Sequence, residues 1–224
     1  MYRRSFSLGD RVSFSIANEL FPHAHNIPKI FTPVVSGRAN LLESLAELFV
    51  AQQAKQGVAY TEVRYSPHIL AGAPEGLSAA AVVDAVTAGL RKGCDKHGIW
   101  VNQILCCMSL EYDWSPEVAD IAIARHRDSP CAVVGIDIAA GEQHFEEAIK
   151  KKAPNMHGEA IARARTAGLG VTIHAGETGG VEHIRQALAE PLCATVRISP
   201  RSCTISPALV ATLTLSVYCQ LTDD

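Results

Sequence analysis

The segment GLGVTIHAGETGG, residues 168–180, has the pattern of a short β-strand that ends in ionisable side chains. Its β-branched run, residues 171–173, favours a sheet. His174 and Glu177 follow directly, and the interior of a sheet does not tolerate such groups unless they are paired. The pattern therefore indicates a strand that carries His174 and Glu177 to a functional site.

The composition predicts a globular protein that does not bind nucleic acid and does not span a membrane. The chain has 224 residues, 48% of them hydrophobic, and 20 basic against 23 acidic residues, which gives a net charge of −3. No basic stripe alternates with aromatic residues, so nucleic acid is not an expected partner. No apolar run reaches the length of a membrane span and the first residues lack a secretory pattern, so we expect a cytoplasmic protein. The seven cysteines lack C-x-x-C spacing and are predicted to be reduced core thiols.

Predicted helices and strands alternate along the chain. Helices are expected over residues 39–56, 78–98, from 115 onward and over about 155–167, and strands within 57–68, 99–108, 131–140 and 170–177. This alternation is typical of βα units around a parallel sheet. A doubly wound sheet with a nucleotide site is an alternative, but no strand is followed by G-x-G-x-x-G or a P-loop. We therefore predict a (β/α) barrel, in which chemistry occurs at the carboxyl ends of the strands.

Several side chains have specific predicted roles in this scheme. The first helix is expected to bury one apolar stripe, made of Leu41, Leu42, Leu45, Leu48 and Phe49. Ser78 and Ser115 are predicted N-caps, and Gly98 is a predicted helix stop. Glu62 and Arg64 share one strand face and are expected to pair with each other.

Five motifs, in a fixed order, resemble those of the adenosine deaminase family. They are EVRYSPH (62–68), ILCCM (104–108), WSP (114–116), VVGIDIAAGE (133–142) and HAGE (174–177). The resemblance runs from about Ile27 to Leu188 and leaves residues 1–26 unmatched, so the barrel domain is expected over 27–224. It implies a zinc-dependent TIM-type (β/α)₈ barrel, with the four strands above as the second to fifth strands of that barrel.

The resemblance also implies roles for individual residues. His174 resembles a zinc ligand, and Glu177 resembles the acid that protonates the purine ring. The final segment LTDD resembles the end of the eighth strand of the family, which implies that Asp223 is a zinc ligand and that Asp224 accepts a hydrogen bond from the purine. Zinc would lower the pKa of a bound water to about 7, and a nearby carboxyl group could donate a proton to the ring. Alternatively, His174 is a core histidine and the acids are ordinary surface groups.

The loop after residues 133–139 differs from the family pattern. The family commonly has a glycine three residues after the aspartate, and its backbone N–H contacts a purine nitrogen. This chain has Ala140 there, followed by Gly141. Because a backbone donor suffices, both residues remain candidates for substrate binding.

Two histidine motifs of the family are missing from their expected places. One is an H-x-H after the first strand, and the other is a GHG after the sixth. His23 and His25 have the H-x-H spacing, but no apolar strand precedes them, so we expect that they are not ligands. The interval from Glu177 to Asp223 is too short for three βα units, and VRISPRSC resembles the seventh strand with its following turn. The first strand and the sixth strand are therefore expected to be missing from an incomplete barrel.

The resemblance implies hydrolytic deamination of adenosine or 2′-deoxyadenosine to inosine or 2′-deoxyinosine and ammonia. Zn²⁺ is the implied cofactor, and a purine nucleoside is the implied partner. Because a catalytic zinc normally has at least three protein ligands, a second hypothesis is a catalytically impaired fragment or splice form. Such a form would bind purine nucleoside or a partner protein without turnover. A different deaminase or amidohydrolase specificity is a third, weaker alternative.

Overall fold

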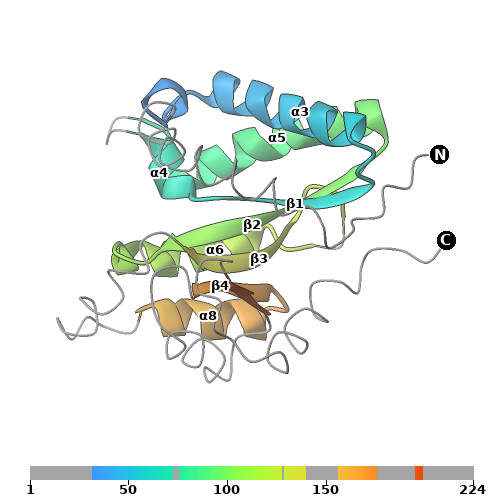
Figure 1. The fold of residues 1–224 in the computed structure, drawn as a ribbon. Helices are drawn as coiled ribbons and strands as arrows, with labels where there is room; N and C mark the ends of the chain where they lie inside the picture. Colours follow the sequence, from blue (N-terminus) through green and yellow to red (C-terminus); the bar gives the residue numbers. More distant parts are fainter. Residues whose placement is uncertain (1–31, 73–75, 128, 140–155, 176–194, 199–224) are drawn as a thin grey trace, which may run out of the picture.

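The computed structural model describes residues 32–72, 76–127, 129–139, 156–175 and 195–198. Five parallel strands form one sheet, in the order of the chain (Figure 1). The strands are β1 (Tyr60–Tyr65), β2 (Trp100–Met108), β3 (Val133–Ala139), β4 (Gly170–Ala175) and β5 (Thr195–Ile198). The helices are α3 (Ala39–Lys55), α4 (Pro67–Ala71), α5 (Ala79–His97), α6 (Ser115–Ala124) and α8 (Met156–Thr166), with a 3₁₀ turn η1 (Tyr112–Trp114). No helix in these ranges is long and apolar enough to cross a membrane.

The described helices pack against a single face of the sheet. Leu105 and Ile136 lie in one core cluster, and Val63 packs against a second cluster formed mainly by α3 and α5. Side chains alternate along a strand, so Arg64 and Asp137 point to the opposite face. A doubly wound sheet would carry helices on both faces, whereas the wall of a barrel carries them on its outside only. The arrangement confirms the prediction of a parallel α/β sheet of the barrel type (Figure 1).

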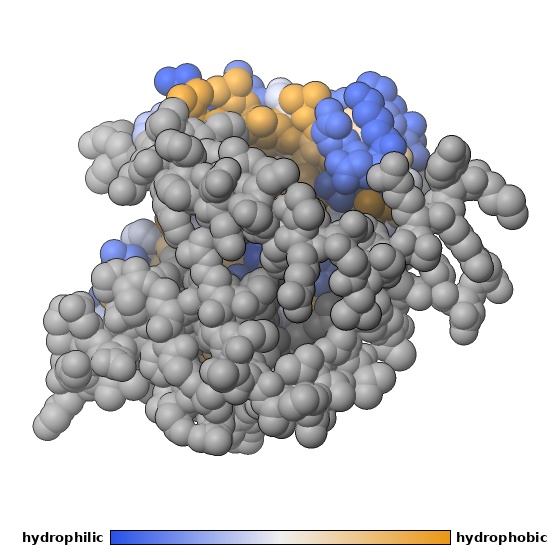
Figure 2. Space-filling view, in the orientation of Figure 1, coloured by the Kyte–Doolittle hydropathy of each residue, from blue (hydrophilic) through white to orange (hydrophobic). Residues whose placement is uncertain are grey.

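The contact between α3 and α5 differs from the predicted apolar stripe. The buried residues of α3 are Leu42, Ala46 and Val50, whereas Leu48 is 58% exposed. A Cβ atom at Gly93 of α5 would lie 2.5 Å from the Cβ of Val50, so the two helices touch almost backbone to backbone. The prediction is confirmed for Leu42, which is buried, and for Leu45 and Phe49, which pack against the same cluster, and it is wrong for Leu48. It missed Ala46 and Val50 because it selected large apolar residues, whereas this close contact selects small ones. Figure 2 shows hydrophobic residues that reach the surface over α3.

One predicted N-cap is confirmed and the other is wrong. The Ser78 hydroxyl accepts a hydrogen bond from the backbone N–H of Ala81 at 3.1 Å, and Gly98 ends α5 with φ of 68°. Ser115 makes no such cap, because the preceding 3₁₀ turn already places it inside the helix. Its hydroxyl instead contacts Nδ1 of His157 at 2.8 Å, which connects α6 to α8.

The strand β5 comes from the segment that resembles the seventh strand of the family. It pairs directly with β4 in parallel, with Thr172 opposite Thr195 and Ala175 opposite Ile198. No further strand lies between β4 and β5 in the described part of the chain. The strand β5 thus lies beside β4, and the expected loss of the sixth strand stays a prediction, because residues 176–194 lie outside the described residues. Residues 199–224, with the candidate eighth strand, also lie outside them.

Candidate functional site

Asp137 lies at the centre of a charged cluster on the helix-free face of the sheet. It belongs to β3 and its side chain is fully buried. Nη1 of Arg64, on β1, donates a hydrogen bond to Oδ2 of Asp137 at 2.6 Å. Nδ1 of His174, on β4, lies 2.9 Å from the same oxygen and 3.2 Å from Oδ1. Three side chains from three strands thus converge toward the carboxyl ends of the strands.

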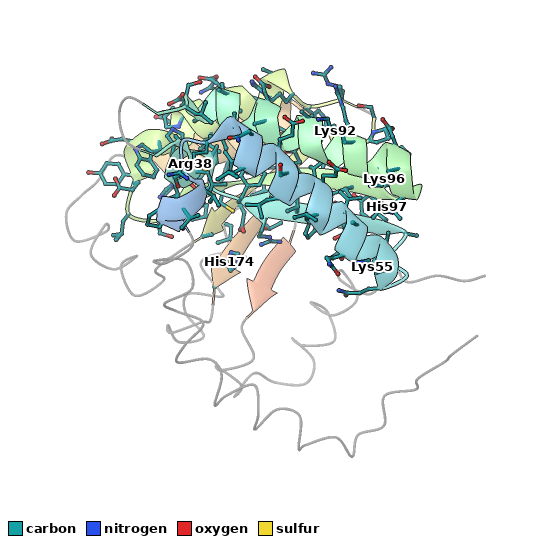
Figure 3. All side chains as sticks on the ribbon, turned by 90° about the horizontal axis from the view of Figure 1, so that it is seen from above. Arg38, Lys55, Lys92, Lys96, His97 and His174 are labelled. Carbon is teal, nitrogen blue, oxygen red and sulfur yellow. The ribbon has the colours of Figure 1, made fainter. Side chains whose placement is uncertain are left out.

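This cluster fixes the orientation of the His174 ring. The Arg64 guanidinium is always charged and pairs with Asp137, so the Asp137 carboxylate is an acceptor and Nδ1 of His174 is the donor. The lone pair of a neutral imidazole is then on Nε2, which faces away from Asp137. The His174 side chain is 25% exposed, so a ligand can reach the ring. Figure 3 shows His174 on the sheet, apart from the lysines of α3 and α5.

A thiol completes the described surroundings of Asp137. Sγ of Cys106, on β2, lies 4.0 Å from Oδ2 of Asp137. Burial raises the pKa of Cys106 to about 12, and the charge of Asp137 raises it further, while Arg64 opposes the shift. Cys106 is therefore a protonated thiol at neutral pH and a weak donor to the carboxylate.

The predicted pairing of Glu62 with Arg64 is wrong. Glu62 instead accepts a hydrogen bond from the Tyr60 hydroxyl at 2.6 Å, and Arg64 crosses the sheet to Asp137. No role or partner was predicted for Asp137 from the sequence. The available signal was a single acid inside the apolar run VVGIDIA, because a buried carboxylate requires a cation or several donors.

A second polar cluster lies near the same end of the sheet. The ring of His68, after β1, stacks on Trp114, with 4.9 Å between ring centroids. Nε2 of His68 is 3.0 Å from Oε2 of Glu117, at the start of α6. These contacts connect the segment after β1 to the segment after β2.

Most of the other predicted site residues fall outside the described residues. This holds for Glu177, Asp223, Asp224, Ala140 and Gly141. It also holds for the excluded pair His23 and His25. The structure therefore locates His174 alone among the predicted site residues.

The chemistry of His174 fits a metal ligand. A histidine that binds a metal through one ring nitrogen usually donates its other N–H to a carboxylate or carbonyl, and His174 has this arrangement with Asp137. Within the described ranges, no group of three or more His, Cys, Asp or Glu residues could hold a metal by itself. Any metal at this site therefore needs further ligands from residues outside those ranges.

Comparison with known proteins identifies the family. Residues 30–200 match the family model described as adenosine deaminase. Adenosine deaminase of Rattus norvegicus is 38% identical over 168 residues, which cover 70% of this chain and 46% of the rat protein. The protein of Xenopus tropicalis is 35% identical over 168 residues, covering 70% of this chain and 45% of its own length. The chain thus spans less than half the length of these curated relatives.

Solved structures share the fold. An amidohydrolase from Burkholderia ambifaria with bound Zn superimposes with a TM-score of 0.59 at 24% identity, covering 71% of this chain and 41% of that protein. An Arabidopsis N6-mAMP deaminase superimposes with a TM-score of 0.57 at 22% identity, covering 80% of this chain and 50% of that protein. At these identities the likeness concerns the fold alone.

Proposed function

Because this chain belongs to the adenosine deaminase family, we propose that it carries part of a zinc-dependent site for the hydrolytic deamination of adenosine or 2′-deoxyadenosine. The products are inosine or 2′-deoxyinosine and ammonia. One observation supports the proposal above all others: Asp137 holds Nδ1 of His174 and leaves Nε2 for a metal. A histidine with a purely structural role in the core does not need a hydrogen bond to a buried carboxylate that is itself paired with a guanidinium. For a metal ligand, such a bond fixes the orientation of the ring and raises its basicity.

In this proposal His174 and Asp223 hold the zinc. Zinc, when bound, makes water a good nucleophile at neutral pH by lowering the pKa of that water to about 7. Arg64 and Asp137 keep the imidazole in the tautomer that binds metal. Because a catalytic zinc normally has three protein ligands, at least one more ligand would come from residues outside the described ranges.

Glu177 and the strand-end acids act on the nucleoside. Glu177 follows β4 by two residues and would donate a proton to the ring nitrogen that gains electron density when water adds. Asp224 would accept a hydrogen bond from the purine. The backbone N–H of Ala140 or Gly141 would donate one to another ring nitrogen.

A second function is binding of purine nucleoside or a partner protein without turnover. It is favoured by the finding that the described residues offer no group of three metal ligands. The two functions make the same prediction for nucleoside binding and opposite predictions for turnover.

The test measures zinc content, nucleoside binding and turnover on the same preparation. The full chain is purified, loaded with zinc and analysed for metal by elemental analysis, and adenosine loss is followed by ultraviolet absorbance. We expect bound zinc and a slow loss of adenosine that Glu177→Gln abolishes without releasing the metal. His174→Ala should release the metal and abolish turnover together.

Calorimetric binding of inosine separates the alternatives. Inosine binding with no turnover, at any zinc content, would support the second function and exclude the first. A folded chain that binds neither zinc nor nucleoside would contradict the first function and the nucleoside-binding form of the second. His23→Ala with His25→Ala serves as a matched control, and we expect unchanged zinc content, because these histidines are not predicted ligands.

A further inference from the structure

Two cysteines far apart in the chain meet at the opposite end of the sheet from His174. Cys94 lies in the last turn of α5, and Cys131 lies just before β3. Both are buried, and the Cys131 thiol donates to Sγ of Cys94 at a sulphur separation of 3.6 Å. The two sulphurs are in van der Waals contact, and a disulfide would bring them to about 2 Å.

The backbone around Cys131 holds its thiol in place. Cys131 has φ of 64°, and it is the only described residue other than glycine with a positive φ. Its N–H donates to the carbonyl of Val101 at 2.7 Å, and its own carbonyl accepts from Nε2 of the buried Gln103 at 2.6 Å. A non-glycine residue in this conformation carries strain that its surroundings must offset. The close approach of the two sulphurs therefore belongs to a tightly held segment.

A surface hollow gives small molecules a route to Cys131. Its volume is about 290 Å³, and it lies between α5 and the segment that joins α6 to β3. The lining residues are Asp84, Thr87, Ala88, Arg91, Arg125, Arg127, Cys131 and Ala132. Cys94 is absent from this lining, so Cys131 is the thiol that an entering molecule meets first.

Burial keeps Cys131 in the thiol form at neutral pH, and the charge of Arg91 acts in the opposite direction. Arg125 is paired with Asp84 through two hydrogen bonds of 2.9 and 3.0 Å. Arg91 has no such partner within the described ranges. Burial, the neighbouring Cys94 and, to a smaller extent, Asp95 together raise the pKa of Cys131 to about 12, whereas Arg91 opposes the shift. Oxidation of this thiol is therefore slow at neutral pH and faster as the pH rises.

We propose that Cys94 and Cys131 form an oxidisable pair that closes to an intramolecular disulfide when hydrogen peroxide enters the hollow. The Cys131 thiolate attacks one peroxide oxygen, the O–O bond breaks, and hydroxide leaves and takes up the thiol proton as water. Cys131 is then a sulfenic acid. The Cys94 sulphur attacks the Cys131 sulphur, the S–O bond breaks, and a second water leaves with the Cys94 proton. Overall, two thiols lose two hydrogens and one peroxide becomes two waters.

The adjacent pair Cys106 and Cys107 provides an internal contrast. Both are buried, but successive residues of β2 point to opposite faces of the sheet. Neither lines the hollow. Adjacent positions in the sequence would suggest Cys106 and Cys107 as the disulfide-forming pair, whereas the distances in the structure favour Cys94 and Cys131.

The test treats the reduced full chain with hydrogen peroxide at pH 8 and maps its cysteines by mass spectrometry without reduction. We expect a linked peptide that contains Cys94 and Cys131, lighter by two hydrogens than its separate parts and cleaved by dithiothreitol. Thermal unfolding of the oxidised chain should shift to higher temperature and return after reduction. This test needs no variant, so it does not depend on whether a substituted chain folds.

Variants then test the order of events. In Cys94→Ser, Cys131 should stop at the sulfenic acid and react with dimedone. Arg91→Gln should slow formation of the link severalfold, whereas Lys55→Gln, which also removes a positive charge but at the end of α3, should not. Recovery of both cysteines as free thiols, or a link of Cys131 to Cys193, Cys203 or Cys219 in place of Cys94, would overturn the proposal.

Discussion

Substitution of Asp137 by asparagine gives the sharpest test of the charged cluster. The change keeps the shape of the side chain and removes its charge. In the native chain Asp137 accepts one hydrogen bond from Arg64 and one from His174, and both donors are charged or strongly polarised. We expect lower stability and weaker zinc binding, because the Arg64 guanidinium loses its partner and His174 loses the acceptor that fixes its tautomer.

The magnitude follows from burial. A hydrogen bond to a charged group contributes about 1.5–3 kcal/mol, so two such bonds set an upper limit of about 6 kcal/mol. Arg64 and His174 are 26% and 25% exposed, so water replaces part of the loss. The asparagine oxygen also remains an acceptor. We therefore expect the free energy of unfolding to fall by about 2–3 kcal/mol, and zinc affinity, if zinc binds, to fall by about 10- to 100-fold.

Urea unfolding of the metal-free chain measures the first quantity, and competition with a chromophoric chelator measures the second. Asp120→Asn is the matched control, because Asp120 is 62% exposed and pairs with Arg163 on the surface. That change should cost no more than about 1 kcal/mol. Equal stability losses for the two variants would refute the account of the buried cluster. An unchanged zinc affinity in Asp137→Asn would refute the role of Asp137 in orienting His174.

Three further predictions concern the scaffold. Gly89→Ala normally stabilises a helix by about 1 kcal/mol, but here the new Cβ would lie 2.0 Å from the Glu43 carbonyl oxygen, so we expect a loss of about 1–3 kcal/mol in urea unfolding. Ser78→Ala should reduce the free energy of unfolding by about 1 kcal/mol, and Ser78→Asp should restore most of it, because either oxygen can cap α5. Burial lowers the pKa of His157, so its contribution to stability is present above about pH 6.5 and is lost as the pH falls below that value. His157→Gln should therefore flatten the decrease in the free energy of unfolding between pH 7.5 and pH 5.5, and an unchanged slope would show that other groups cause it.

The sequence was sufficient for the sheet and its helices because their signals are local. The N-cap Ser78, the stop at Gly98 and the apolar strand before Asp137 each act over a few residues, and each is confirmed. The resemblance of five ordered motifs added the family, which the comparisons confirm.

Side-chain partners were harder to predict because they depend on strand order. The expected pair of Glu62 and Arg64 lies within one strand, whereas the real partner of Arg64 is 73 residues away on β3. The same limit applies to Cys94 and Cys131, whose contact exists only once α5 and β3 are packed. Ala46 and Val50 of α3 were overlooked because the prediction assumed that the largest apolar side chains are the buried ones. Where two helices are in close contact, small side chains are buried between them.

The tight contact between α3 and α5 also restricts the position of β1 along its neighbour β2. Gly89 lies against Glu43 and Ala46, and one turn further on Gly93 lies against Val50. The two helices are therefore in close contact at two successive turns. A shift of α3 by one turn would push side chains into backbone. Only residues 56–59 join α3 to β1, so the position of this helix limits how far β1 can slide along β2. Gly89 and Gly93, on the outer side of the sheet, thereby help to fix the position of Arg64 along β1, and so its alignment with the buried carboxylate of Asp137 on the other side.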